Sequence, residues 1–264
     1  MKKILCMVFC LMIVPAMAFA VVNPALQTNN PYSTRVIHIT MSYGANGMLT
    51  GQSQTITEDG VGLDGGTFHS VTNIAYKIIG GLAKALSSVS TTNKSWSDGS
   101  TQTSVTTTKY EYDAGGRLTG ASGTRTINGN SAEYVDSEGV THAASTYSGS
   151  YTLTYEIISG QAMVVSESGT MVTNNYNEDT GAYELFSTET STTTFEYAMF
   201  AGQLKMTRSV SDSNTVYDAA DANGVHYFDH TTITTTYSYD ANGALTGVSG
   251  SGTGYGYELT DSGN

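Results

Sequence analysis

The chain has 264 residues, of which 11 are lysine or arginine and 23 are aspartate or glutamate, giving a formal charge of −12 at pH 7. A protein this negative repels nucleic acid and anionic lipid headgroups, so we expect neither as a partner. The chain is long enough to bury a core as a single all-β domain.

The first 20 residues have the pattern of a secretory signal peptide. Lys2 and Lys3 precede an apolar run over residues 4–16, and the small residues Ala18 and Ala20 suit cleavage. The run is too short for a membrane-spanning helix. We therefore expect an exported protein that is periplasmic, at the cell surface or extracellular.

Both cysteines, Cys6 and Cys10, lie within this segment. Beyond residue 20 the chain can therefore form no disulfide, no thiolate metal site and no cysteine nucleophile. Stability must then come from the packing of the sheet.

Residues 21–33, with Pro24 and Pro31, form the next segment, an extended lead, and residues 34–264 are expected to form a single β-repeat domain. Turns that contain glycine recur in this domain about every 20 residues, which is typical of repeat architectures. These turns fall at Gly47, Gly66, Gly81, Gly99, Gly116, Gly139, Gly160, Gly181, Gly202, Gly224, Gly243 and Gly263.

The segments between the turns alternate as β-strands do. Before Gly160, Tyr151, Leu153 and Tyr155 share one face, while Thr152 and Thr154 share the other. Short connections join neighbouring strands, so we predict an all-β fold, an antiparallel up-and-down meander of about twelve long strands. A sheet this wide curls or closes into a barrel-like shell.

Two details of this shell are predicted from the sequence. The strands are either long continuous ribbons or are interrupted by bulges, and in the second case the Ser-Gly pairs are the expected bulge points, namely Ser122-Gly123, Ser168-Gly169 and Ser249-Gly250. The concave or buried face should carry Tyr112, Tyr155, Tyr197, Tyr237 and Tyr239.

One repeated motif resembles a known family. Residues 110–119 read YEYDAGGRLT, residues 237–246 read YSYDANGALT, and residues 43–50 read YGANGMLT. They resemble the YD repeat of Rhs-type and wall-associated proteins, and the resemblance implies a β-hairpin array that coils into a curved shell, with carbohydrate binding often proposed. Because this chain is far shorter than the family's enclosing shells, we carry over the fold and not the cargo role.

In a meander, alternate turns fall at opposite ends, and here the two ends differ in chemistry. One end gathers acidic turns, whose oxygens are the ligands that Ca²⁺ prefers. The alternative is simple turn chemistry, because aspartate caps turns through the backbone. The candidate calcium ligands are Asp136, Glu138, Glu178, Asp179, Asp218 and Asp221.

Three turns of the opposite end are apolar. Their candidate contact residues are Ile78, Ile79, Ile157, Ile158, Met199 and Phe200. Exposed loops rarely place such side chains in water. These tips either fold inward as a plug or form a contact surface for another copy, a partner or a membrane.

The sequence indicates no enzyme. It holds no nucleophile elbow, Walker loop, dinucleotide fingerprint or zinc-binding helix. Its five histidines are scattered, and His226 and His230 would be too far apart along one strand to share a metal. We expect no catalytic residue, and no cofactor apart from weakly bound calcium.

Three functions remain. The first is a secreted, non-enzymatic β-repeat protein with a structural or binding role, its partner a polysaccharide, an envelope component or a second copy through the apolar turn end. The second is an outer-membrane β-barrel protein, favoured by the even strand count but not by the strands, which lack an outward apolar band. The third uses the threonine rows as a hydroxyl lattice for polysaccharide or ice.

Overall fold

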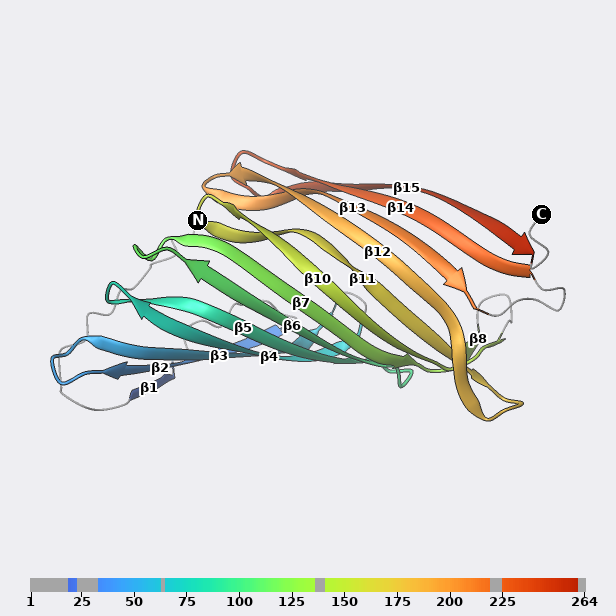
Figure 1. The fold of residues 1–264 in the computed structure, drawn as a ribbon, viewed down its shortest axis with the longest axis horizontal. Helices are drawn as coiled ribbons and strands as arrows, with labels where there is room; N and C mark the ends of the chain where they lie inside the picture. The colour runs from blue at the N-terminus through green and yellow to red at the C-terminus, as the bar shows by residue number, and fades with distance from the viewer. Residues whose placement is uncertain (1–18, 23–32, 63–64, 136–140, 219–224, 261–264) are drawn as a thin grey trace.

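The computed structural model describes residues 19–22, 33–62, 65–135, 141–218 and 225–260. Within these ranges the protein is a curled sheet of thirteen antiparallel strands, each paired with its neighbour in chain order (Figure 1). The strands of this sheet are β1 (Phe19–Val22), β2 (Ser33–Tyr43), β3 (Leu49–Val61), β4 (Thr67–Ile79), β5 (Leu82–Ser95), β6 (Thr101–Tyr112), β7 (Leu118–Ser131), β10 (Ser145–Ile158), β11 (Gln161–Asn177), β12 (Ala182–Phe200), β13 (Gln203–Tyr217), β14 (Val225–Tyr239) and β15 (Leu245–Thr260).

The predicted all-β meander of about twelve long strands is confirmed by β2–β7 and β10–β15. The short strand β1 pairs with the side of β2 that faces away from β3. The first two residues of β1 belong to the predicted signal peptide. Between β7 and β10, the strands β8 (Tyr134–Val135) and β9 (Thr141–His142) form a separate two-stranded ribbon. The part of the chain that the structure describes has no helix able to span a membrane.

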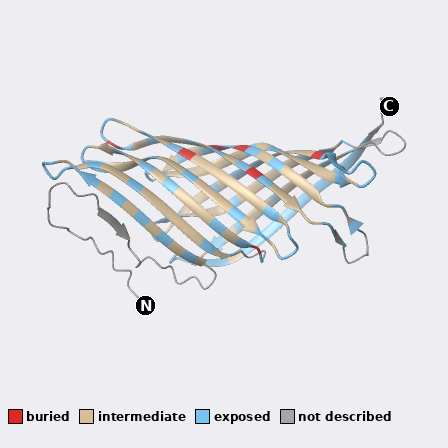
Figure 2. Ribbon diagram, turned by 90° about the horizontal axis from the view of Figure 1, so that it is seen from below, coloured by how far each residue is buried: buried red, intermediate tan, exposed pale blue. Residues whose placement is uncertain are grey.

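Of the two predicted shapes, the sheet adopts the curled one. Its strand order ends at β1 on one side and at β15 on the other, and no hydrogen-bonded pairing between described strands joins these two edges. The curled sheet is therefore a single layer with two edges. Figure 2 shows that half-buried and exposed residues alternate along its strands and that buried residues are few.

The turns sort to two ends, as alternate turns of a meander must. The tip end, as we call it, holds the β2–β3, β4–β5, β6–β7, β10–β11, β12–β13 and β14–β15 turns. Two of these turns, at Asp113 and Asp240, share one geometry. Each aspartate carboxylate accepts the backbone N–H four residues on, at 2.8 Å, and the glycine three residues on has a φ of 78° or 77°. Glycine suits this position because side chains disfavour the left-handed region.

All six tip-end hairpins also carry a β-bulge. In each hairpin the register shifts directly before a tyrosine of the first strand, and the extra residue lies on the second strand. The tyrosines are Tyr43, Tyr76, Tyr112, Tyr155, Tyr197 and Tyr239. The prediction of bulges at Ser-Gly pairs is wrong, because the pairing runs unbroken through Gly123, Gly169 and Gly250. Repeated bulges increase twist and bend a strand, so these six bulges explain how such long strands curl.

The glycines within the strands serve close packing. A Cβ on Gly169 would lie 2.6 Å from the ring of Tyr151 on the next strand, and a Cβ on Gly123 would lie 3.2 Å from the ring of Tyr155. Here glycine leaves room for a tyrosine ring to lie across the neighbouring strand. We call this better-covered side of the sheet the inner face.

The inner face carries what core the protein has. Among the described side chains, those that are buried are Thr108, Ile127, Tyr151, Leu153 and Ser187, all on this face by register. No large side chain among the described residues is completely enclosed. The five tyrosines predicted for this face lie half-buried on it. The core is therefore a thin layer whose side chains stay partly accessible to solvent.

This layer contains an ion pair that the sequence pattern does not predict. Arg125 and Glu167 meet at 2.5 Å, and the Arg125 guanidinium lies 5.0 Å from the ring centre of Tyr151. Tyr151 is thus covered by a cation on one side and by the Gly169 strand on the other, which makes it the centre of the inner layer.

Burial raises the pKa of a set of inner-face tyrosines, which are Tyr76, Tyr110, Tyr112, Tyr147, Tyr151, Tyr197 and Tyr217. A raised pKa means that the folded state holds these protons more tightly than the unfolded chain does. Stability should therefore be fully present below about pH 10 and fall as pH rises through that value. Urea unfolding midpoints at pH 8 and pH 11 test this, and equal midpoints would contradict it.

Candidate binding surface

The outer face, opposite the inner layer, carries a regular array of hydroxyl groups. On β7, β10, β11 and β12, the strand pairing brings twelve serines and threonines into three rows of four. The rows are Thr126, Ser150, Thr170, Thr190; Thr124, Thr152, Ser168, Thr192; and Ser122, Thr154, Ser166, Thr194. We call this array the hydroxyl grid. Its spacing is about 4.8 Å across strands and about 6.7 Å along them.

The grid faces solvent. Every member except Ser166 is exposed, and Ser166 is half-buried. None of the twelve hydroxyls makes a hydrogen bond to another group in the part of the chain that the structure describes. By contrast, inner-face hydroxyls pair with one another, as Thr193 does with Ser211 at 3.1 Å. The grid hydroxyls are therefore available to a ligand as both donors and acceptors.

Aromatic rings lie where these rows continue toward the edge of the sheet. The first grid row runs from Thr190 through Asn214 to His230 and Tyr255, and the next position along the strands holds Phe228 and Tyr257. We call Phe228, His230, Tyr255 and Tyr257 the aromatic ladder.

The ladder rings lie side by side, with Phe228 and His230 half-buried and the two tyrosines exposed. Phe228 and Tyr257 are 5.0 Å apart with their planes within 6°, and His230 and Tyr255 are 4.9 Å apart. Tyr255 is 62% exposed and Tyr257 48% exposed. Exposed rings held side by side offer a flat apolar surface beside a polar one.

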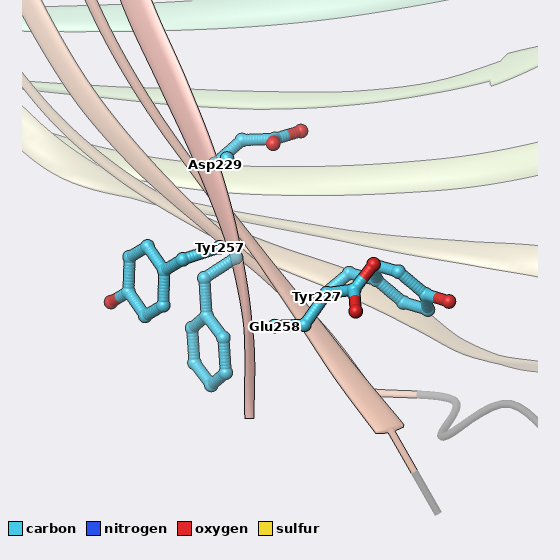
Figure 3. A pocket seen from close by; sticks show the side chains of 6 residues that line it. Tyr227, Asp229, Tyr257 and Glu258 are labelled. Atoms are coloured by element: carbon cyan, nitrogen blue, oxygen red, sulfur yellow. The ribbon is translucent and has the colours of Figure 1, made fainter. Parts of the chain in front are cut away.

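A hollow of about 400 Å³ opens at the same corner, lined by Tyr227, Phe228, Asp229, Gly256, Tyr257 and Glu258. Figure 3 shows Tyr257 on one side of the ribbon, with Tyr227 and Glu258 on the other. The Tyr217 hydroxyl donates to the Asp229 carboxylate at 2.9 Å. Burial, followed by this carboxylate, raises the pKa of Tyr217, so its proton stays in place at neutral pH. The hollow thus joins aromatic and acidic groups at the edge of the sheet.

A second hollow of about 420 Å³ lies across β3, β4 and β5. Asp59 and His69 face each other there, with 2.6 Å between the carboxylate and Nδ1. Since the histidine is already engaged by Asp59, we assign no ligand to this hollow.

Three of the six predicted calcium ligands, Asp136, Glu138 and Asp221, lie outside the described residues. Glu178 and Asp179 are exposed in the β11–β12 turn, where the Asp179 N–H donates to the Asn177 side chain at 2.9 Å. Asp218 is exposed at the end of β13. Among the described residues, no three histidine or carboxylate side chains come together as a metal site.

Calcium binding at the acidic end stays a prediction, with a direct test. If the acidic turns hold calcium, the thermal unfolding midpoint should be higher in millimolar calcium than in chelator, because a ligand that binds only the folded state stabilises it. The same midpoint in both buffers would leave the acidic turns a role in solvation alone.

The six apolar tip residues lie at the tip end, as the meander requires. Met199 is 47% exposed, and Ile78, Ile79, Ile157, Ile158 and Phe200 are half-buried. Phe200 packs against Tyr239, with 5.1 Å between ring centres, and Ile79 lies against the Gly116 turn. The tips thus contact neighbouring turns, and their use as a contact surface stays a prediction.

Sequence reasoning missed the aromatic ladder. The signal was present in the period of two at residues 250–257, where glycine alternates with Ser, Thr and Tyr. That pattern places Tyr255 and Tyr257 on one face, opposite a glycine face. Comparison with protein-family models and with curated proteins gave no match to this chain.

Proposed function

We propose that this is an exported, non-enzymatic β-repeat protein whose outer face binds an extended, neutral polysaccharide at the cell envelope or outside the cell. The observation that carries the proposal is the hydroxyl grid, whose twelve side chains have no partner within the described protein and lie in register with exposed aromatic rings.

The chemistry of the grid matches that of a sugar chain. Sugar hydroxyls donate and accept hydrogen bonds, as serine and threonine hydroxyls do, and a long chain can engage several rows at once. The ladder rings of Tyr255 and Tyr257 add an apolar surface for the faces of sugar rings. The backbone hydrogen bonds between strands hold the β-sheet rigid, so these groups are presented to a ligand with little loss of conformational entropy.

Charge narrows the class of polysaccharide. The grid contains no ionisable side chain, and the chain as a whole carries −12. An anionic polymer would be repelled at long range, whereas a neutral one would not. We therefore infer a neutral polymer.

The same face favours a water-exposed protein over the outer-membrane alternative. A barrel in a bilayer would turn its outer face toward acyl chains, where hydroxyls without partners cost free energy. Partitioning of the exported protein between the soluble and the detergent-extracted membrane fraction tests this point, and we expect it in the soluble fraction.

Co-sedimentation tests the proposal itself. The protein is mixed with insoluble cellulose or chitin, or run through a gel that contains a soluble neutral glucan or anionic polygalacturonate. We expect binding to at least one neutral polymer, little effect of salt, and no binding to polygalacturonate. Failure to bind any neutral polymer, or equal retention by the anionic one, would refute the proposal.

A further inference from the structure

The last strand of the sheet, β15, leaves one of its two sides without a partner. It pairs with β14 over residues 245–260, and no other described strand lies beside it. At 3.3 Å per residue, its 16 residues present about 53 Å of unpaired backbone N–H and C=O groups. Such an edge is a template for another strand.

This edge lacks the devices that normally protect an exposed strand. Proteins block their edges with charged side chains, proline, bulges or a covering element. From Leu245 to Tyr257, β15 contains no charged residue and no proline, and its bulge lies next to the turn, at Thr246. An unprotected edge of this length is suited to pairing.

The opposite edge of the sheet narrows the choice of partner. There, β1 already pairs with residues 38–41 of β2. Residues 33–37 of β2 stay open as well, but pairing of β15 with β2 of another copy would be a head-to-tail contact that continues into an open chain of copies, whereas pairing of β15 with itself closes after two copies. Two copies related by a two-fold axis perpendicular to the sheet would align β15 antiparallel to itself, as a closed, isologous contact.

We propose that β15 pairs with β15 of a second copy, which joins two curled sheets into one continuous sheet. A two-fold axis perpendicular to the sheet keeps the outer face of both copies on the same side. The hydroxyl grids and aromatic ladders of the two copies then extend one surface. This inference rests only on the unpaired backbone of β15 and does not depend on the proposed function.

Cysteine scanning tests the pairing, because Cys6 and Cys10 are the only cysteines and can be replaced by serine. In that background, single cysteines at Ser249, Ser251, Thr253 and Tyr255 are oxidised and run on a non-reducing gel. In two β15 strands related by a two-fold axis, a residue lies opposite the same residue of the other copy only where the axis passes through the pair. We therefore expect a covalent dimer that peaks at one of these positions and falls off on either side.

Two controls complete the experiment. Ser168→Cys places the thiol in the middle of the grid, away from any edge, and should not cross-link. The double variant Ser251→Glu with Thr253→Glu brings like charges together across the axis and should convert a dimer to a monomer by light scattering, with an unchanged circular dichroism spectrum.

Three results would overturn the proposal. The first is a monomer by light scattering at every concentration, and the second is cross-linking at Ser168→Cys as strong as on β15. The third is an intramolecular disulfide in the variant Val36→Cys with Thr253→Cys, because β15 would then close on β2 of its own chain.

Discussion

Replacing Tyr151 with alanine should destabilise the protein more than any other single inner-face change, by about 3 to 5 kcal/mol, the range for removing a buried aromatic side chain. Tyr151 is 7% exposed in a layer where few side chains are buried at all. Its loss would also expose Arg125 and leave the Gly169 strand uncovered. The free energy of unfolding from urea titration measures the effect.

The glycine beneath the ring supplies a matched test. Gly169→Ala should cost about 1 to 3 kcal/mol, because the new methyl group meets Tyr151 and the adjacent backbone. Gly247→Ala is the control, since the nearest atom to its Cβ would be 4.0 Å away and no clash follows. Equal effects of these two alanines would contradict the packing described for the inner face.

The two sites should also be coupled. In the double variant with Tyr151→Ala and Gly169→Ala, the ring that the methyl group meets is gone, so the combined loss should be smaller than the sum of the separate losses. Full additivity would mean that the Gly169 methyl group is opposed by the backbone alone.

The second large effect is expected on binding. Replacing Tyr255 and Tyr257 together with alanine should weaken polysaccharide binding about tenfold or more, as expected for exposed aromatic anchors of an interface. Stability should change little, because both rings lie on the outer face, where Tyr255 is 62% and Tyr257 48% exposed. Binding isotherms on the polymer identified by co-sedimentation provide the measurement.

Replacement of the same two residues with phenylalanine separates stacking from hydrogen bonding. The ring faces remain, so we expect most of the affinity to remain. If the alanine variant binds as the original protein does, the ladder is not part of the binding surface, and the grid alone must account for the affinity.

The sequence was sufficient to predict the meander and the sorting of its turns. Glycine turns at regular spacing, together with strands that alternate Tyr and Thr, leave few other ways to arrange a chain. The parity of the turns then places Ile157 and Phe200 at one end without further information. These features depend on local patterns, which a single sequence displays.

The bulges and the grid could not be predicted in the same way. Ser-Gly pairs look like bulge points, yet Gly169 lies in an unbroken ladder because Tyr151 needs its space. A bulge shifts the register by one residue, and such a shift reverses which face a side chain occupies. Alignment of Thr152 with Thr192 in one row therefore depends on the register shifts beside Tyr155 and Thr173, whose positions the sequence does not mark.

The unpaired edge was also beyond prediction. Whether a sheet of twelve long strands closes depends on accumulated twist and bulging over all of them, and not on any one segment. The neutral composition of β15 was visible in the sequence, but it gained meaning only once the structure placed β15 at an edge.

The most direct test of the binding surface is to place charge and bulk in the hydroxyl grid. The variant Thr152→Lys with Thr192→Lys alters two exposed members of the middle row, and Thr34→Lys alters an exposed outer-face threonine of β2, outside the grid. In isotherms on the same neutral polymer, we expect the grid variant to lose most of its affinity, and Thr34→Lys to bind as the original protein does. Unchanged binding by the grid variant, with its fold intact by circular dichroism, would contradict the account.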